Sequence, residues 1–265
     1  MRRTLGRSRG GLAHFSSWAP WALWALGLAL AGCSAASMPA VHSEPERLEL
    51  ARRAMARRDY TVATELLKSY LANNGGSRDV DEAIYRLGLC YAGAKEYPSA
   101  QVEFERLVRD YPESDSSASA AFRLGEVLFA QTRGRDFDQE YTHKALDQWQ
   151  NYLSSYPGHW LNPTAQRRVA EVRARLGAKL ADAGKLYLKL KLPDPARVYF
   201  RRVLDEYPDT PAAEEARLGL ALCDAQQGHR AAAIEQLKQV EAAHPGGELA
   251  RRAASERTRL ERRPG

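Results

Sequence analysis

The sequence has few of the side chains that enzymes commonly use for catalysis or for binding metals. Among 265 residues there are three cysteines and six histidines, and no two histidines lie four residues apart. After residue 33 there is no H-E-x-x-H zinc motif, no P-loop, no G-x-G-x-x-G and no G-x-S-x-G. We therefore expect a protein that is not an enzyme and that holds no cofactor and no metal.

Patterns typical of β-strands and of disulfide-linked domains are missing as well. No stretch alternates β-branched and polar residues over the length of a strand. Two cysteines, Cys90 and Cys223, remain after Cys33, and both lie in apolar helical stretches far apart in the sequence. We expect both to pack in the core without forming a disulfide.

The first 33 residues have the composition of a targeting segment. Four arginines and no acidic residue precede an apolar run at residues 18–31, which is shorter than a membrane-spanning helix. The run ends in Leu30-Ala31-Gly32-Cys33, which resembles a bacterial lipoprotein signal. We expect residues 1–32 to be a signal peptide, Cys33 to be acylated and residues 33–45 to form a tether. An ordinary signal peptide, in which Cys33 is incidental, is the alternative.

The formal net charge is +6, but the ends of the chain carry most of it. Without the four arginines of the first 32 residues the net charge is +2, and residues 247–265 contribute six arginines against three glutamates. The body of the chain is therefore nearly neutral, which argues against a nucleic-acid partner. We interpret the basic C-terminal tail as a solvated helix end, with contact to anionic lipid as the alternative.

An internal repeat is the most informative feature. Its clearest copy, residues 81–112, contains Leu87-Gly88, Tyr91, Ala100, Phe104 and Pro112. Small residues at Gly88 and Ala100 let two helices cross closely, and the aromatic residues fill the space beside the crossing. The proline ends the second helix. This spacing resembles the tetratricopeptide repeat (TPR), a pair of antiparallel helices.

Four further copies repeat this pattern, two of them with extra residues between the halves. They contain Leu50-Ala51, Ala54, Ala63 and Leu67; Leu124-Gly125, Leu128, Ala145 and Trp149; Ala183-Gly184, Tyr187, Ala196 and Phe200; and Leu218-Gly219, Leu222, Ala233 and Leu237. We therefore expect an all-α protein, a right-handed α-solenoid of about five tetratricopeptide-type helical hairpins at residues 46–245. The expected repeats are 46–76, 78–113, 115–158, 163–209 and 211–246, followed by a basic tail at 247–265.

Two irregularities interrupt the repeat. About eight extra residues, 132–139, lengthen the connection inside the third copy, and residues 163–190 have the apolar spacing of one long helix. A solenoid also provides a concave surface, lined chiefly by the first helix of each hairpin. The residues expected to bind peptide on this surface are Arg52, Met55, Tyr85, Leu89, Phe122, Glu126 and Phe129.

The combination of lipid signal, tether and five repeats resembles the BamD family, the repeat lipoproteins of the outer-membrane β-barrel assembly machine. The stretch 136–142, Tyr156-Pro157, Arg175-Leu176 and residues 203–210 carry the resemblance, which covers residues 46–245. It implies a lipid-anchored scaffold on the periplasmic side of the outer membrane. The implied partners are the barrel-forming subunit (BamA-like) and unfolded outer-membrane proteins, with no small-molecule substrate.

The resemblance also implies roles for particular residues. Tyr85, Phe122 and Phe129 become candidates for binding the aromatic-ended targeting strand of unfolded barrel proteins. The residues implied in docking acidic groups of the barrel-forming subunit are Arg197, Arg201 and Arg202. A periplasmic TPR adaptor of the Tol/cell-division or pilus-assembly type is the alternative function. It is disfavoured because no coiled-coil heptads precede residue 46 and because pilus-assembly lipoproteins lack the long connection at residues 132–139.

Overall fold

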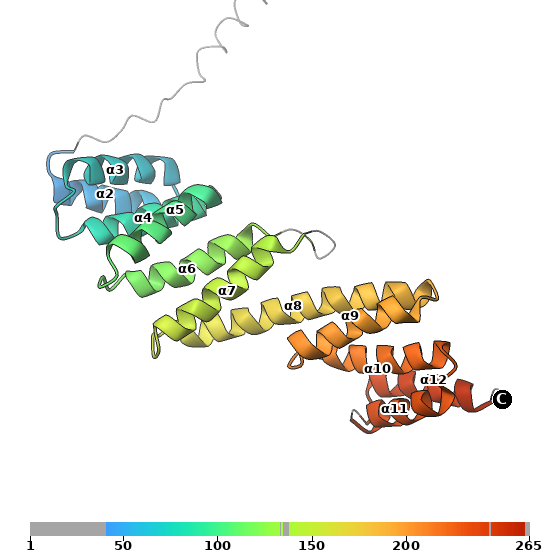
Figure 1. Ribbon diagram of the computed structural model, residues 1–265. Helices are drawn as coiled ribbons and strands as arrows, with labels where there is room; N and C mark the ends of the chain where they lie inside the picture. Colours follow the sequence, from blue (N-terminus) through green and yellow to red (C-terminus); the bar gives the residue numbers. More distant parts are fainter. Residues whose placement is uncertain (1–40, 133, 135–137, 244, 263–265) are drawn as a thin grey trace, which may run out of the picture. The chain divides into compact units, whose positions relative to one another are not determined.

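The computed structural model describes residues 41–132, 134, 138–243 and 245–262 (Figure 1). Within these ranges the chain forms eleven helices and no strand, all in the compact unit His42–Gly265. The expected all-α class and the solenoid of TPR-like hairpins are confirmed. Cys33, the signal segment and Asp136-Phe137 lie outside the described residues.

Ten of the helices pair into five antiparallel hairpins, each packed on the next along the chain (Figure 1). The pairs are α2 (Glu44–Ala56) with α3 (Tyr60–Asn73), α4 (Val80–Gly93) with α5 (Tyr97–Asp110), α6 (Ser117–Ala130) with α7 (Glu140–Ser155), α8 (Asn162–Lys189) with α9 (Pro193–Glu206), and α10 (Pro211–Gln226) with α11 (Arg230–Ala243). None of the described helices is both long enough and apolar enough to span a bilayer.

Glycines and aromatic rings meet where the two helices of a hairpin cross. A Cβ atom added to Gly88 would lie 2.6 Å from the Phe104 ring, and one added to Gly184 would lie 2.7 Å from the Phe200 ring. Both rings are fully buried. The repeat spacing therefore reflects packing, because the ring occupies the volume that the missing side chain leaves free.

The second helices of the middle hairpins end at a shared signal. The last residue of each of the helices α5, α7 and α9 directly precedes a Tyr-Pro pair. The tyrosines of these pairs are Tyr111, Tyr156 and Tyr207. Proline disfavours helical backbone in the residue before it, so each pair ends its helix at the same place in the repeat.

The connections inside the hairpins are short and share one backbone feature. Four of them are three residues long, and their middle residues adopt positive φ: Arg58 at 60°, Lys95 at 64°, Lys191 at 61° and Gly228 at 84°. The third connection differs, because nine residues, 131–139, separate α6 from α7.

Helix α8 is twice as long as most of the others, with 28 residues, and it contributes to two cores. Its first half places Val172 and Leu176 in the core that contains Trp149. Its second half places Leu188 in a separate core with Phe200. At a rise of 1.5 Å per residue the helix is about 42 Å long, so hairpin α6–α7 packs along only part of it.

The basic segment after Gly247 forms helix α12 (Glu248–Arg262). Ala253 and Leu260 pack in the core of the fifth hairpin. Arg257 forms ion pairs with Glu241 at 2.7 Å and Glu261 at 2.9 Å, so carboxylates of the same protein balance its charge. The segment that the sequence predicts as a basic tail thus covers the apolar end of the solenoid.

Candidate protein-binding surfaces

The seven residues expected to bind peptide lie on the first helices of the first three hairpins, α2, α4 and α6. We call them the N-terminal row. Six of them are exposed or half-buried, and Phe122 is the exception with 1% of its surface exposed. Its ring packs against Tyr152 at 5.7 Å and Trp149 at 6.4 Å between centroids. Phe122 is therefore a core residue and offers no ring to a ligand.

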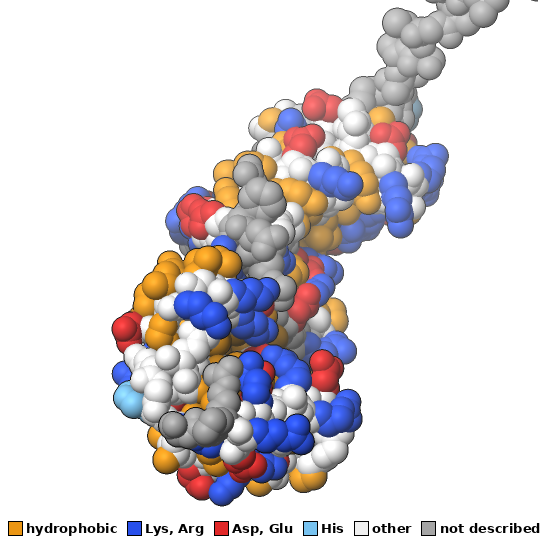
Figure 2. All heavy atoms as spheres, turned by 90° about the vertical axis from the view of Figure 1, so that its right-hand side faces the viewer, with side chains coloured by type: hydrophobic (Ala, Val, Ile, Leu, Met, Phe, Trp, Pro, Cys, Tyr) orange, Lys and Arg blue, Asp and Glu red, His pale blue; other side chains and the backbone are white. Residues whose placement is uncertain are grey.

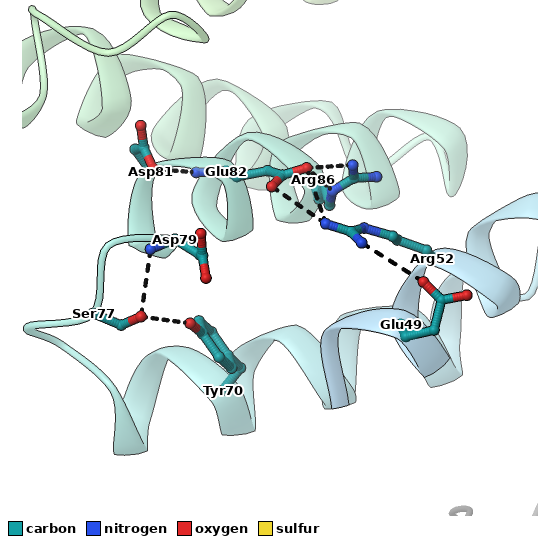
Figure 3. A network of polar contacts seen from close by, with 8 residues as sticks. All are labelled: Glu49, Arg52, Tyr70, Ser77, Asp79, Asp81, Glu82 and Arg86. Carbon is teal, nitrogen blue, oxygen red and sulfur yellow. Dashed lines mark hydrogen bonds and ion pairs between the residues drawn. The ribbon is translucent and has the colours of Figure 1, made fainter. Parts of the chain in front are cut away.

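Charged groups connect the helices that carry the row (Figure 3). The carboxylate of Glu82 in α4 accepts hydrogen bonds from Arg52 of α2, at 3.4 Å, and from Arg86 of its own helix. Arg52 also forms an ion pair with Glu49 at 3.6 Å. Hydrogen bonding from Arg86 and the nearby guanidinium of Arg52 lower the pKa of the Glu82 carboxyl below its usual value.

A second charged group links α6 to α8. Glu126 forms ion pairs with Arg123 and, at 3.7 Å, with Arg168 of α8, which also pairs with Glu171 at 3.0 Å. Carboxylates and guanidinium groups thus alternate across successive first helices. Because these pairs are partly solvent-exposed, each contributes little to stability.

The apolar members of the row are half-buried, so part of each side chain faces outward. The Tyr85 ring packs on Phe104 at 5.9 Å, and the Phe129 ring packs on Trp149 at 5.8 Å between centroids. The buried rings of Phe104 and Trp149 therefore hold these two rings in place on the side that faces the core. Aromatic side chains, including Tyr and Phe, are enriched at protein–protein interfaces.

A second surface lies on the last two hairpins. A surface cleft of 530 Å³ opens between α9, α10 and α11. Its lining comprises Arg197, Arg201, Glu214, Arg217, Leu220, Gln236, Gln239, Val240 and Ala243. We call it the C-terminal cleft. Three arginines against one glutamate give it a basic character that suits an acidic partner.

The three arginines predicted to dock an acidic partner have different environments. Arg197 donates to Asp224 and Gln227, each at 2.6 Å, and Arg202 pairs with Glu206 at 2.8 Å. Arg201 lines the cleft, is exposed, and makes no hydrogen bond or ion pair with the described residues. Sequence reasoning missed Arg217 and Gln236, because only the packing of α10 and α11 brings them beside α9.

The described residues contain no group of three histidine, cysteine or acidic side chains placed to hold a metal ion. Cys90 and Cys223 are buried and unpaired. The two surfaces present apolar rings, amides and charges of both signs.

Similar solved structures include a TPR repeats protein from Bacteroides fragilis, 11% identical over 83% of this chain and 100% of that chain, with a TM-score of 0.47. The TPR2AB domain of yeast Sti1, in a pHSP90 complex, is 12% identical over 82% of this chain and 84% of that chain, with a TM-score of 0.42. PilW, a type IV pilus biogenesis factor, is 16% identical over 81% of this chain and 100% of that chain, with a TM-score of 0.39. These likenesses concern the fold alone.

No curated protein matches the chain at a significant level. A family model does match. Residues 87–222, from the second hairpin to the fifth and about half of the chain, match the model of YfiO, described as an outer membrane lipoprotein. The chain belongs to this family of outer membrane lipoproteins, the YfiO or BamD family.

Proposed function

We propose that this protein is a non-catalytic scaffold subunit of the machine that assembles β-barrel proteins in the outer membrane. In this proposal Cys33 carries the lipid anchor, and the hairpins face the periplasm. The observation that carries the proposal is the family match over residues 87–222. The TPR-like architecture supports a protein partner, because stacked hairpins present extended surfaces for binding other chains.

The C-terminal cleft is the proposed docking site for the barrel-forming subunit. Arg201 is the central residue, because its guanidinium is exposed and has no carboxylate partner among the described residues. Arg217 lies in the same lining but pairs with Glu214. Arg197 already forms an ion pair with Asp224, so its role is to position α9 beside α10. An acidic side chain entering the cleft would pair with Arg201.

The N-terminal row is the proposed site for unfolded barrel proteins. Tyr85 and Phe129 offer half-buried rings for an aromatic side chain, while Met55 and Leu89 extend the apolar surface. Arginines of the same helices, such as Arg52 and Arg86, suit the terminal carboxylate of an extended chain. Phe122 drops out of this site because it is buried.

An affinity capture from detergent-solubilised envelope tests the docking proposal. The wild-type protein should recover the barrel-forming subunit, and Arg201→Glu should lose most of it. Arg109→Glu is the matched control, because Arg109 is an exposed arginine on α5, away from the cleft. Recovery of Tol proteins, peptidoglycan synthases or pilus proteins in place of the barrel-forming subunit would refute the proposal.

A binding assay tests the substrate site. A labelled peptide that ends in an aromatic residue and a free carboxylate should bind the wild-type protein. The Tyr85→Ala, Phe129→Ala double variant should bind it at least about ten-fold more weakly, since each lost ring removes more than about 1 kcal/mol. Tyr141→Ala, which removes an exposed ring on α7, is the control. Equal affinities in all three proteins would exclude the row as the site.

A further inference from the structure

One position in the first helix of each hairpin differs sharply in burial along the solenoid. It lies two residues after the small residue of the helix crossing. Its occupants, in hairpin order, are Arg53, Cys90, Val127, Leu186 and Ala221. In three hairpins the residue is buried: Cys90 and Ala221 are 0% exposed and Val127 is 3% exposed.

Cys90 shows what lies over this position. Helix α3, the second helix of the preceding hairpin, packs on α4, and its Thr64 lies close enough to lower the pKa of the Cys90 thiol, against the larger effect of burial. In the first hairpin the position is exposed and holds an arginine, Arg53. A polar residue is expected there, because the outer face of a terminal repeat meets water.

The fourth hairpin breaks this rule. Leu186 is 56% exposed although it is a large apolar residue inside the solenoid. The length of α8 explains the exposure. Hairpin α6–α7 shares its core with the first half of α8, around Val172, so it leaves the second half of the helix uncovered on this side.

Further apolar and basic side chains surround Leu186. Leu190, the residue directly after α8, is 58% exposed, and Leu192 in the same connection is 46% exposed. Lys189 and Lys191 are exposed and form no ion pair with the described residues. These five residues form the α8 end patch. Figure 2 faces this end of α8 and shows hydrophobic side chains adjoining Lys and Arg side chains there.

We infer that the α8 end patch binds an amphipathic helix of a partner protein, in the place that the second helix of a preceding hairpin occupies elsewhere in the solenoid. The helix would set apolar residues against Leu186 and Leu190 and acidic residues opposite Lys189 and Lys191. A second copy of this chain does not fit, because a two-fold contact would bring the lysines of both copies together. This inference is independent of the proposed function.

A peptide titration tests the inference directly. The probe is a fluorescent, alanine-based helical peptide of about 18 residues, with leucines at helical spacing and glutamates beside them. Leu186→Arg, which installs the residue type of the first hairpin, should weaken its binding at least about ten-fold. Val102→Arg is the matched control, because Val102 is 60% exposed on α5, outside the patch.

Charge reversal supplies the second arm. The Lys189→Glu, Lys191→Glu variant should lose affinity for the acidic peptide and gain affinity for the same peptide with lysines in place of glutamates. Circular dichroism checks that every variant folds. Equal binding by wild type and Leu186→Arg would overturn the inference. Vesicles of anionic lipid binding in place of the peptide, or concentration-dependent dimers lost in Leu186→Arg, would overturn it as well.

Discussion

Arg197 donates a hydrogen bond to the Asp224 carboxylate at 2.6 Å and thereby joins α9 to α10. Asp224 is 7% exposed and also accepts a hydrogen bond from Gln236 of α11, at 2.7 Å. Burial raises the pKa of the Asp224 carboxyl, but the hydrogen bonds from Arg197, Gln236 and His229 outweigh it and hold the pKa below its ordinary value. One carboxylate therefore connects three helices around the C-terminal cleft.

Asp224→Asn should destabilise the protein at neutral pH by about 1–3 kcal/mol, because it removes the charge that satisfies Arg197. Since the folded pKa of Asp224 is depressed, its stabilising effect is present above the unfolded pKa and is lost as pH falls through the folded pKa. Urea unfolding at about pH 7 and about pH 3 should show the difference between variant and wild type shrinking in acid. A difference that does not change with pH would contradict this.

Gly88→Ala should destabilise the protein by about 1–3 kcal/mol, because the new methyl group would overlap the buried Phe104 ring. Gly75→Ala is the matched control, because nothing lies within 4 Å of a Cβ atom there. Its effect should stay within about 0.5 kcal/mol. Thermal unfolding of both variants compares the two positions. Similar melting temperatures would show that the crossing tolerates a side chain.

Lys95→Gly should stabilise the protein by about 0.5–1 kcal/mol, since Lys95 adopts a left-handed backbone with φ of 64°. The reverse change at the equivalent turn, Gly228→Ala, should destabilise by about 1 kcal/mol, since φ there is 84°. Chemical denaturation measures both. Opposite signs are expected, and a stabilising Gly228→Ala would be inconsistent with the turn geometry.

The thiols of Cys90 and Cys223 should resist alkylation in the folded protein. Burial raises the pKa of each thiol to about 11, so almost no thiolate is present at neutral pH. Mass spectrometry after iodoacetamide treatment should find both cysteines unmodified, and both modified once denaturant is added. Rapid labelling of the native protein would mean that its core opens readily.

Cys33→Ser should prevent lipid attachment and release the protein from the membrane fraction, or leave its signal segment uncleaved. The expectation follows from the Leu30-Ala31-Gly32-Cys33 signal. Fractionation of envelopes and the mass of the mature chain measure the outcome. Cys90→Ser, which leaves the signal intact, is the control. Normal maturation and membrane association of Cys33→Ser would exclude lipidation at this residue.

The hairpins were predictable because each repeat position requires one kind of residue. A close crossing requires a small residue such as Gly88, and the space beside it requires a ring such as Phe104. The long helix α8 followed from the same apolar spacing. These signals are local, since they depend on residues within one hairpin, and local patterns can be recognised in a single sequence.

The surfaces were harder to predict because they depend on contacts between hairpins. Phe122 lies on a first helix like its neighbours in the row, yet the Trp149 indole nitrogen donates to its carbonyl oxygen at 3.2 Å and the two side chains share one core. Arg197 has the pattern of a solvated residue on an amphipathic helix. Its partner Asp224 belongs to the next hairpin, and nothing in the repeat spacing reveals that pair.

The two cores of α8 impose an order on folding during synthesis. The ribosome releases the first half of the helix while α6 and α7 are already available to cover Val172 and Leu176. Leu188, in the second half, must wait for Phe200 of α9 before it is shielded from water. A nascent chain that stalled after α8 would thus expose fresh apolar surface to chaperones while its earlier hairpins were already folded.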